Sequence, residues 1–320
     1  MSQPRYSLIA ALVVVSAVLM TSCSAPAPAE TGSVTISISG AFALFPMVTA
    51  WADEYTLTHP GVDFDIQAGG AGKGMTDVLA GAVDVAMLSR EACPEELEQG
   101  AIPFPAAIDA VVPTVNAGNP VLEDLLRVGL ARETGHALWI EGRPMTWGEL
   151  VGSGESSTVN VYTRSDSAGA AEVWALYLGG QAQEDLRGTA VNADPGLAEA
   201  VRQDVLGIGY NNIAFAYDPE TGRQLAGMRV LPLDINGDGQ ITPDEDFYAT
   251  RDEITAAIAA RTYPYPPARL LYLVTSGAPS PEVADFLRWV MTDGQALSPA
   301  AGYVVLDDAT VEAGLALLGE

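Results

Sequence analysis

The stretch Ser39-Gly40-Ala41-Phe42-Ala43-Leu44-Phe45-Pro46 is the first of three junctions that decide the fold, because each joins a strand-like run to the start of a helix. The other two are Gly69-Gly70-Ala71-Gly72-Lys73-Gly74 and Arg164-Ser165-Asp166-Ser167-Ala168-Gly169-Ala170. Each junction sets small residues where the first backbone N–H groups of a helix lack a partner, and where the helix dipole adds about half a positive charge. The three junctions are therefore predicted to hold a small oxyanion.

Strand and helix patterns alternate around these junctions. Strands are predicted at residues 34–38, 62–67, 83–88, 108–116, 159–163, 206–210 and 269–275, and helices at residues 44–55, 75–79, 170–178, 197–204 and 282–291. The alternation predicts an α/β fold with parallel strands and right-handed crossovers. Ligands of such sheets bind beyond the carboxyl ends of the strands, so we expect a cleft between two lobes that closes by hinge motion.

Four further segments complete an ordered set of motifs. They are Gly81-Ala82-Val83-Asp84-Val85-Ala86-Met87-Leu88-Ser89-Arg90, Gly207-Ile208-Gly209-Tyr210, the run from Tyr263-Pro264 to Tyr272, and the run from Gly294-Gln295 to Gly302-Tyr303. With the three junctions, their order resembles the phosphate-binding protein of bacterial phosphate ABC transporters over nearly all of the chain after residue 32. The resemblance implies a two-lobed periplasmic-binding-protein type 2 fold, in which each lobe is a mostly parallel sheet flanked by helices. It also implies a monomer that delivers phosphate, or a related oxyanion, to an ABC permease.

The resemblance also implies the roles of individual residues. Arg164, Asp166 and Gly169 match the family pattern R-x-D-G-S-G-T, so Arg164 is expected to clamp the anion and Asp166 to hold Arg164 in place. Ser89 and Arg90 form a second matching polar pair. The alternatives are a surface ion pair at Arg164 and a solvated arginine at position 90. The expected ligand-binding residues are Leu44, Phe45, Ala71, Gly72, Ser89, Arg90, Arg164, Asp166, Ala168, Gly169 and Ala170.

Four of these positions depart from the family pattern. Leu44, Ala71, Ala168 and Ala170 stand where the family usually offers hydroxyl donors. A hydrogen bond to a charged group contributes about 1.5–3 kcal/mol, so losing several would weaken phosphate binding unless nearby serines or a different ligand compensate. The backbone donors survive every substitution. Lys73 lies in a glycine loop that lacks the Walker A pattern, and we interpret it as a peripheral positive charge.

A separate motif predicts a calcium site. The loop from Asp234 to Glu245 carries oxygen ligands at its positions 1, 3 and 5, glycine at position 6 and glutamate at position 12. The expected ligands are Asp234, Asn236, Asp238, the backbone carbonyl of Gln240, and Glu245. A strand-like run, Met228 to Leu233, precedes the loop, so we expect an EF-hand-like loop outside a helix pair with a structural Ca²⁺. The alternative is an acidic surface turn.

The N-terminus indicates export. Arg5 precedes an apolar run from Leu8 to Met20 that is too short for a comfortable membrane span. The segment Met20-Thr21-Ser22-Cys23 resembles a bacterial lipoprotein cleavage site, which predicts a membrane lipoprotein facing the periplasm or extracellular space. The alternative is an ordinary secretory signal with an incidental cysteine. Acylation of Cys23 would leave Cys93 as a lone, partly buried thiol.

These features predict a four-part organisation of the chain. Residues 1–22 are a lipoprotein signal peptide, residues 23–32 a tether, residues 33–116 with 269–320 the first lobe, and residues 117–268 the second lobe. The chain is expected to cross into the second lobe near Gly118-Asn119-Pro120.

Composition and missing motifs exclude several functions. The net charge of −26 argues against nucleic acid or anionic lipid as a partner. His59 and His136 are isolated from the motifs, and we find no nucleophile and base in a catalytic relation, so we expect no enzyme. Two alternatives stay open: a two-lobed sensor or adhesion protein that has lost phosphate transport, and, more remotely, a phosphatase-like enzyme.

Overall fold

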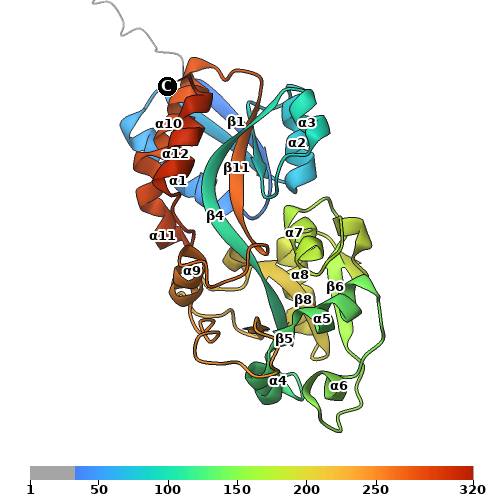
Figure 1. Cartoon of the computed structure of the whole chain (residues 1–320). Helices are drawn as coiled ribbons and strands as arrows, with labels where there is room; N and C mark the ends of the chain where they lie inside the picture. The colour runs from blue at the N-terminus through green and yellow to red at the C-terminus, as the bar shows by residue number, and fades with distance from the viewer. Residues whose placement is uncertain (1–32, 320) are drawn as a thin grey trace, which may run out of the picture. The chain divides into compact units, whose positions relative to one another are not determined.

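Two long strands, β4 (Ala101–Asn116) and β11 (Ala268–Ser276), organise residues 33–319, the part of the chain that the computed structural model describes. The main sheet has the order β2-β1-β3-β11-β4-β8-β6-β7, and β9 also pairs with β4. Both long strands run antiparallel to every neighbour, whereas the other pairings of this sheet are parallel. Figure 1 shows β4 running from the upper to the lower half of the fold.

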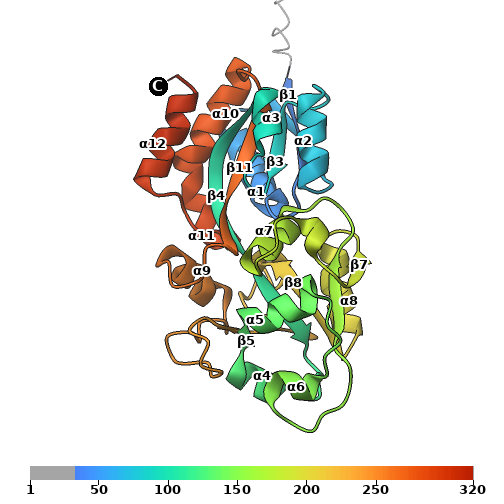
Figure 2. The same ribbon diagram turned by 45° about the vertical axis from the view of Figure 1, so that its right-hand side comes forward.

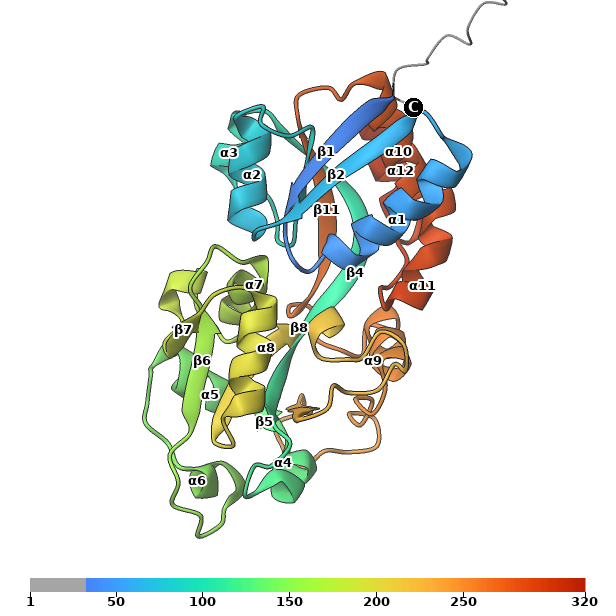
Figure 3. The same ribbon diagram turned by 180° about the vertical axis from the view of Figure 1, so that it is seen from behind.

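The upper half contains the first and last parts of the described chain. Its other strands are β1 (Val34–Gly40), β2 (Val62–Ala68) and β3 (Val85–Leu88), and its helices are α1 (Phe45–Thr58), α2 (Ala71–Leu79), α3 (Pro94–Glu98), α10 (Pro281–Met291), α11 (Ser298–Ala301) and α12 (Asp308–Leu317), with the 3-10 turn η4 (Asp293–Leu297). Figure 3 shows α1, α10 and α12 on one side of these strands and α2 and α3 on the other. We call this half lobe 1.

The lower half, lobe 2, contains the middle of the chain. Its strands are β5 (Leu130–Ala131), β6 (Asn160–Arg164), β7 (Thr189–Val191), β8 (Gly207–Asn212), β9 (Met228–Val230) and β10 (Leu233–Asp234), and its helices are α4 (Leu122–Val128), α5 (Arg132–Gly135), the π-helix η1 (His136–Ile140), α6 (Trp147–Val151), α7 (Gly169–Tyr177), α8 (Asp194–Gln203) and α9 (Arg251–Ala259), with 3-10 turns η2 (Gln183–Asp185) and η3 (Ile213–Phe215). The short β5 and β10 pair with each other outside the main sheet. In Figure 2, α7 and α8 lie near the boundary with lobe 1.

Each lobe has its own hydrophobic core. The core of lobe 1 gathers Trp51, Phe104 and Phe286, and that of lobe 2 gathers Trp139, Trp174 and Tyr210 around edge-to-face and stacked ring contacts. Along β4 the change from one core to the other falls between Ala107 and Ala110, and along β11 it falls between Leu271 and Ala268. The chain therefore crosses between lobes inside β4, upstream of the Gly118-Asn119-Pro120 turn.

The structure confirms the predicted α/β fold and the strand and helix that flank each junction. It also shows elements that the sequence did not predict, notably the first half of β4 and helices α4, α9 and α12. The first half of β4 contains Pro103 and Pro105, which have no N–H to donate to a ladder. Both prolines are tolerated because β11 is the only strand paired with this half of β4, whose other edge forms only a bridge from Ile108 to Val304 among the described residues.

Candidate functional site

The three junctions meet where the lobes face each other. The backbone N–H of Gly72, at the start of α2, donates to the carbonyl of Ser167, before α7 (3.3 Å). The Arg164 guanidinium lies over the Phe42 ring of the first junction, 5.8 Å from its centroid. Gly169, the first residue of α7, lies against Ser89 so closely that an added Cβ would stand 2.3 Å from the Ser89 carbonyl oxygen. Residues far apart in sequence thus form one interlobe site.

The start of α7 provides the clearest group of free backbone donors. The N–H of Ala168 donates to Oε1 of Gln183 (2.8 Å), whose Nε2 in turn donates to the Asp166 carbonyl (3.0 Å). The N–H groups of Gly169, Ala170 and Ala171 have no acceptor among residues 33–319. All three residues are buried, so these donors are available to an anion that enters the interlobe site.

The first two junctions offer fewer free donors. The N–H groups of Leu44 and Phe45 are used in tight turns, on the carbonyls of Ala41 and Phe42, and the Leu44 side chain is buried in the core of lobe 1. Ala71 is also buried, and the N–H of Gly72 is used in the bond to lobe 2.

Of the serines that could replace the missing hydroxyls, Ser39 is unavailable because its Oγ donates to Asp77 (2.7 Å). Ser165 and Ser167 are exposed within the third junction. Lys73 pairs with Asp77 on the surface, with 47% of its side chain exposed, as its interpretation as a peripheral charge predicts.

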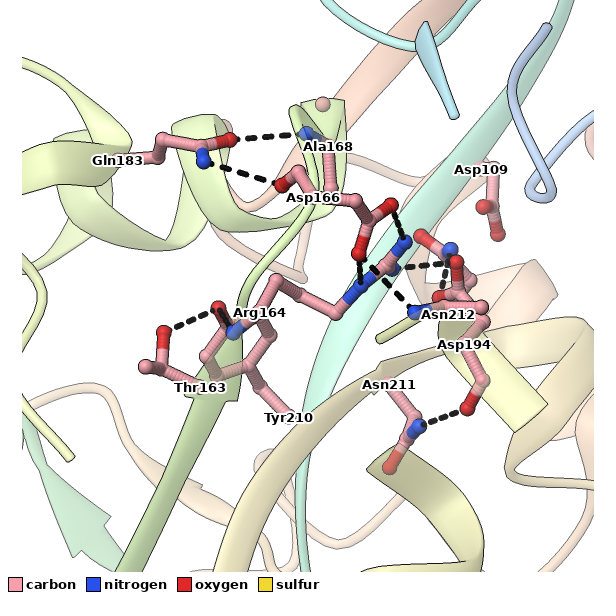
Figure 4. A network of polar contacts seen from close by, with 12 residues as sticks. Asp109, Thr163, Arg164, Asp166, Ala168, Gln183, Asp194, Tyr210, Asn211 and Asn212 are labelled. Carbon is pink, nitrogen blue, oxygen red and sulfur yellow. Dashed lines mark hydrogen bonds and ion pairs between the residues drawn. The ribbon is translucent and has the colours of Figure 1, made fainter. Parts of the chain in front are cut away.

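Arg164 lies at the centre of a buried polar network (Figure 4). Its side chain is 1% exposed, its Nε donates to Oδ1 of Asp166 (2.9 Å), and a second nitrogen, Nη2, reaches the other oxygen of that carboxylate. Nη1 donates to Asp194, which also accepts from Nδ2 of Asn212. Burial disfavours the charged form of Asp166, but the hydrogen bonds from Arg164 hold its pKa below the usual value. Asp166 therefore holds the Arg164 guanidinium through both carboxylate oxygens, and Asp194 is a second partner that the sequence did not predict.

Arg269 of β11 extends the network into the crossing strands. Its Nη1 donates to the carbonyl of Gly169 (3.1 Å), and Nη2 contacts Asn212 and lies 3.6 Å from Oδ2 of Asp109 on β4. Asp109 is 1% exposed, and neither oxygen of its carboxylate has a hydrogen-bond partner among residues 33–319. Burial raises the pKa of Asp109 to about 7, with Arg269 opposing the shift. Burial also raises the pKa of Asp194, which unlike Asp109 is hydrogen-bonded to Arg164 and Asn212.

Ser89 and Arg90 lie at the end of β3, but they face different surroundings. Ser89 is buried against Gly169. The Arg90 guanidinium donates hydrogen bonds to both carboxylate oxygens of Glu96 in α3 (2.7 and 2.8 Å). It also donates to the Glu91 carbonyl (2.8 Å). Its charge is therefore compensated by lobe 1 itself.

The loop from Asp234 to Glu245 lies away from the interlobe site, between β10 and α9. Asp234 accepts the N–H groups of Gly237, Asp238 and Gly239 (2.8, 3.2 and 2.9 Å), and Glu245 accepts those of Ile235, Asn236 and Thr242 (2.9, 3.0 and 3.0 Å). These two carboxylates are 4% and 5% exposed and form no ion pair within residues 33–319.

The donor types and the uncompensated charge of this loop fit a hard cation such as Ca²⁺. However, no three acidic, histidine or cysteine side chains of the described chain are grouped closely enough to hold a metal. Asp238 instead accepts from Nδ2 of Asn236 (3.2 Å). The last three residues of the loop, 243–245, form a turn.

Comparison with known proteins shows the family to which the chain belongs. A sequence profile described as a PBP superfamily domain matches residues 25–294. The chain belongs to the PBP superfamily. Among curated relatives of this PBP superfamily member, the protein SphX of Synechocystis sp. is 24% identical over 309 residues, covering 92% of this chain and 85% of the relative. The phosphate-binding protein PstS of Pseudomonas aeruginosa is 26% identical over 314 residues, covering 90% and 88%.

Solved structures confirm the fold of this PBP superfamily member. A structure with bound phosphate from Clostridium perfringens, described as a phosphate ABC transporter substrate-binding protein, superposes with a TM-score of 0.69 at 18% identity, over 86% of this chain and all of that one. An ABC-type phosphate transport receptor from Vibrio cholerae gives 0.61 at 20% identity, over 85% and 100%.

The predictions for residues 1–32, including lipidation of Cys23, lie outside the described residues. Cys93 is a free, partly buried thiol, as expected. Between residues 33 and 319, none of the helices has the length and apolar character needed to span a bilayer.

The sequence did not predict that Asp194, Arg269 and Asp109 belong to the site. A sequence feature could have indicated the first two: Asp194 is a charged residue at the start of an amphipathic helix, and Arg269 is a charged residue at the start of an apolar strand. Asp109 similarly interrupts the apolar run of β4. Such charges inside buried elements indicate mutual pairing, but the sequence does not say which charges meet.

The raised pKa of Asp109 predicts a specific pH dependence. Because its pKa is higher in the folded than in the unfolded protein, the native state binds the extra proton, and this contribution to stability is complete below about pH 4 and lost as the pH rises through about 7. Asp109→Asn removes the titration. The free energy of unfolding of this variant, relative to the parent, should therefore rise between pH 5 and pH 8 in urea titrations. A constant difference between the two proteins would show that Asp109 does not titrate in this range.

Proposed function

We propose that this protein is an extracytoplasmic solute-binding protein that captures phosphate, or a related oxyanion, between its lobes and delivers it to an ABC permease. One observation carries the proposal: the free N–H groups at the start of α7 lie in the place where the three junctions and Ser89 meet. Relatives named for phosphate binding, and the fold shared with phosphate transport receptors, support the same ligand class.

The charge balance of the site is compatible with an anion. Arg164 and Arg269 are compensated by Asp166 and Asp194 when Asp109 carries its proton, so the network is then neutral. The binding energy must then come mainly from the α7 dipole and its N–H groups. No catalytic role is proposed, because His59 stacks on Tyr55 and His136 contacts the Leu178 carbonyl, both away from the interlobe residues.

Lobe closure provides the clean test of this proposal. Replacing Arg164 would strand two buried carboxylates and cost about 3–5 kcal/mol of stability, so loss of binding would be ambiguous. Gly169→Ala instead sets a methyl group 2.3 Å from the Ser89 carbonyl, a clash that opening of the lobes relieves. We expect it to weaken phosphate binding at least about tenfold in titration calorimetry, which corresponds to about 1.4 kcal/mol.

Gly154→Ala is the matched control, because an added Cβ there meets no atom within 4 Å, and phosphate binding should be unchanged. The parent should bind one phosphate per monomer. Binding of sulfate but not phosphate would reject the phosphate assignment. Absence of heat with every oxyanion would favour the alternative of a two-lobed sensor or adhesion protein.

We further propose that the loop from Asp234 to Glu245 holds a structural Ca²⁺. The support is the pair of buried, uncompensated carboxylates together with the twelve-residue ligand pattern. The oxygen atoms of Asp234, Asn236, Asp238, Glu245 and the Gln240 carbonyl would hold the ion. Its positive charge would compensate the carboxylates. Asp238 would have to turn from Asn236 toward the ion.

Calcium should raise the melting temperature of the parent, and a chelator should reverse the rise, because a ligand of the folded state stabilises it by mass action. Glu245→Gln should abolish this response. Glu312→Gln on the exposed face of α12 should leave it intact. Equal melting temperatures with calcium and with chelator would identify the loop as an acidic turn.

We also propose export and lipid anchoring through Cys23, on the basis of the leader pattern that precedes it. Cys23→Ser should convert a membrane-associated protein into an unprocessed precursor or a soluble form, as judged by fractionation and radiolabelled fatty acid. Cys93→Ser is the control and should stay membrane-bound. If the Cys23→Ser variant is retained and the parent takes up no lipid label, the leader is an ordinary secretory signal.

A further inference from the structure

A cavity of about 440 Å³ runs along the flank of α7 beside the proposed anion site. Ala168, Glu172, Val173 and Leu176 line it at spacings that place them on one face of the helix. The facing wall comes from the segment after β3, including Arg90, and from the turn that leads into β11. Its volume lies in the range of about 300–1,000 Å³ typical of small organic ligands, and is large for an anion of four oxygens.

The end of this cavity at the start of α7 is suited to an anion. Arg269 lines the cavity and is 4% exposed, and its Nε–H has no hydrogen-bond partner among residues 33–319. The same guanidinium contacts the carbonyl of Gly169, so it lies beside the free N–H groups of the first turn of α7. A buried guanidinium donor without an acceptor, next to a helix N-terminus, indicates that an anionic group completes the site.

The rest of the lining has the opposite charge. Glu91, Glu172 and Glu184 contribute to it, and none of them forms an ion pair within the described chain. Glu91 accepts the Tyr272 hydroxyl (2.7 Å) and Glu172 accepts the Gln183 N–H (3.0 Å), so both carboxylates are fixed by neutral donors. Arg90, on the same lining, is already held by Glu96. Between these charged groups the cavity offers the apolar side chains of Val173 and Leu176.

We infer that the cavity binds the organic arm of a phosphate monoester or phosphonate whose short apolar chain ends in an ammonium group. This inference rests on the proposed function, since the phosphorus oxyanion occupies the same end of α7. The apolar arm contacts Val173 and Leu176, and the ammonium group compensates the carboxylates. The arm also supplies binding energy that the missing hydroxyls at Ala168 and Ala170 no longer provide to a bare anion.

Titration calorimetry with three probes tests the inference on the purified protein: inorganic phosphate, ethyl phosphate and O-phosphoethanolamine. The two esters differ mainly in the ammonium group. We expect O-phosphoethanolamine to bind about five- to tenfold more tightly than ethyl phosphate, because the carboxylates lie in a partly desolvated cavity. Glu172→Gln should remove most of this preference, and Glu312→Gln on α12 should keep it.

A second variant tests the position of the arm. Leu176 is 42% exposed, so Leu176→Trp can fill the cavity without disturbing a core, and it should weaken both esters at least about tenfold while inorganic phosphate binds as before. Leu57→Trp, at a leucine that is 76% exposed on α1, is the control for a surface tryptophan.

The outcomes separate the two proposals. Binding of inorganic phosphate without either ester would overturn this inference and leave the proposed function standing. Equal binding of the two esters, unchanged by Glu172→Gln, would overturn the ammonium assignment. Failure of all three probes would overturn the proposed function together with the inference.

Discussion

The buried pairing of Arg164 and Arg269 with Asp109, Asp166 and Asp194 is the constraint on which the interlobe site depends. These side chains come from β4, β6, α8 and β11 and from the turn after β6, so one polar network fixes the carboxyl end of β6 against both crossing strands. Charges this deeply buried are costly unless paired, and removing any one partner would leave another uncompensated. The network therefore fixes where α7 begins, and with it the direction of the donors that face lobe 1.

The fold was predictable because its strongest signals are local. Apolar alternation followed by small residues marked β1, β2 and β6 and the helices after them, and the structure keeps these elements within a few residues. The first half of β4 was missed because Pro103 and Pro105 oppose a strand in isolation. Its pairing with β11 involves residues more than 150 positions away, and edge pairing of that kind leaves no periodic signal in the sequence.

The strand-to-helix junctions of the candidate site could be predicted from the sequence, but most pairings between its charged side chains could not. Gly169 and Asp166 were assigned to the site because they match the family pattern that the third junction resembles. The partnership of Arg164 with Asp194 joins β6 to a helix about thirty positions later, and that of Arg269 with Asp109 joins two strands across the sheet. The pairing of Arg90 with Glu96 was also not predicted, because the resemblance had assigned the charge of Arg90 to the ligand.

The passage of the main chain through β4 and β11 has a mechanical consequence. A pair of hydrogen-bonded strands resists sliding strongly but twists and bends with little resistance, since the ladder bonds stay nearly constant in length. We therefore expect rotation of one lobe against the other to be concentrated where β4 exchanges β11 for β8 as its partner, near Ala110 and Val111, and where the ladder shifts register at Leu271 and Tyr272. This joint includes Asp109 and Arg269, which lie opposite each other in the ladder next to Ala110, so the resistance to lobe rotation depends on residues of the same network that forms the interlobe site.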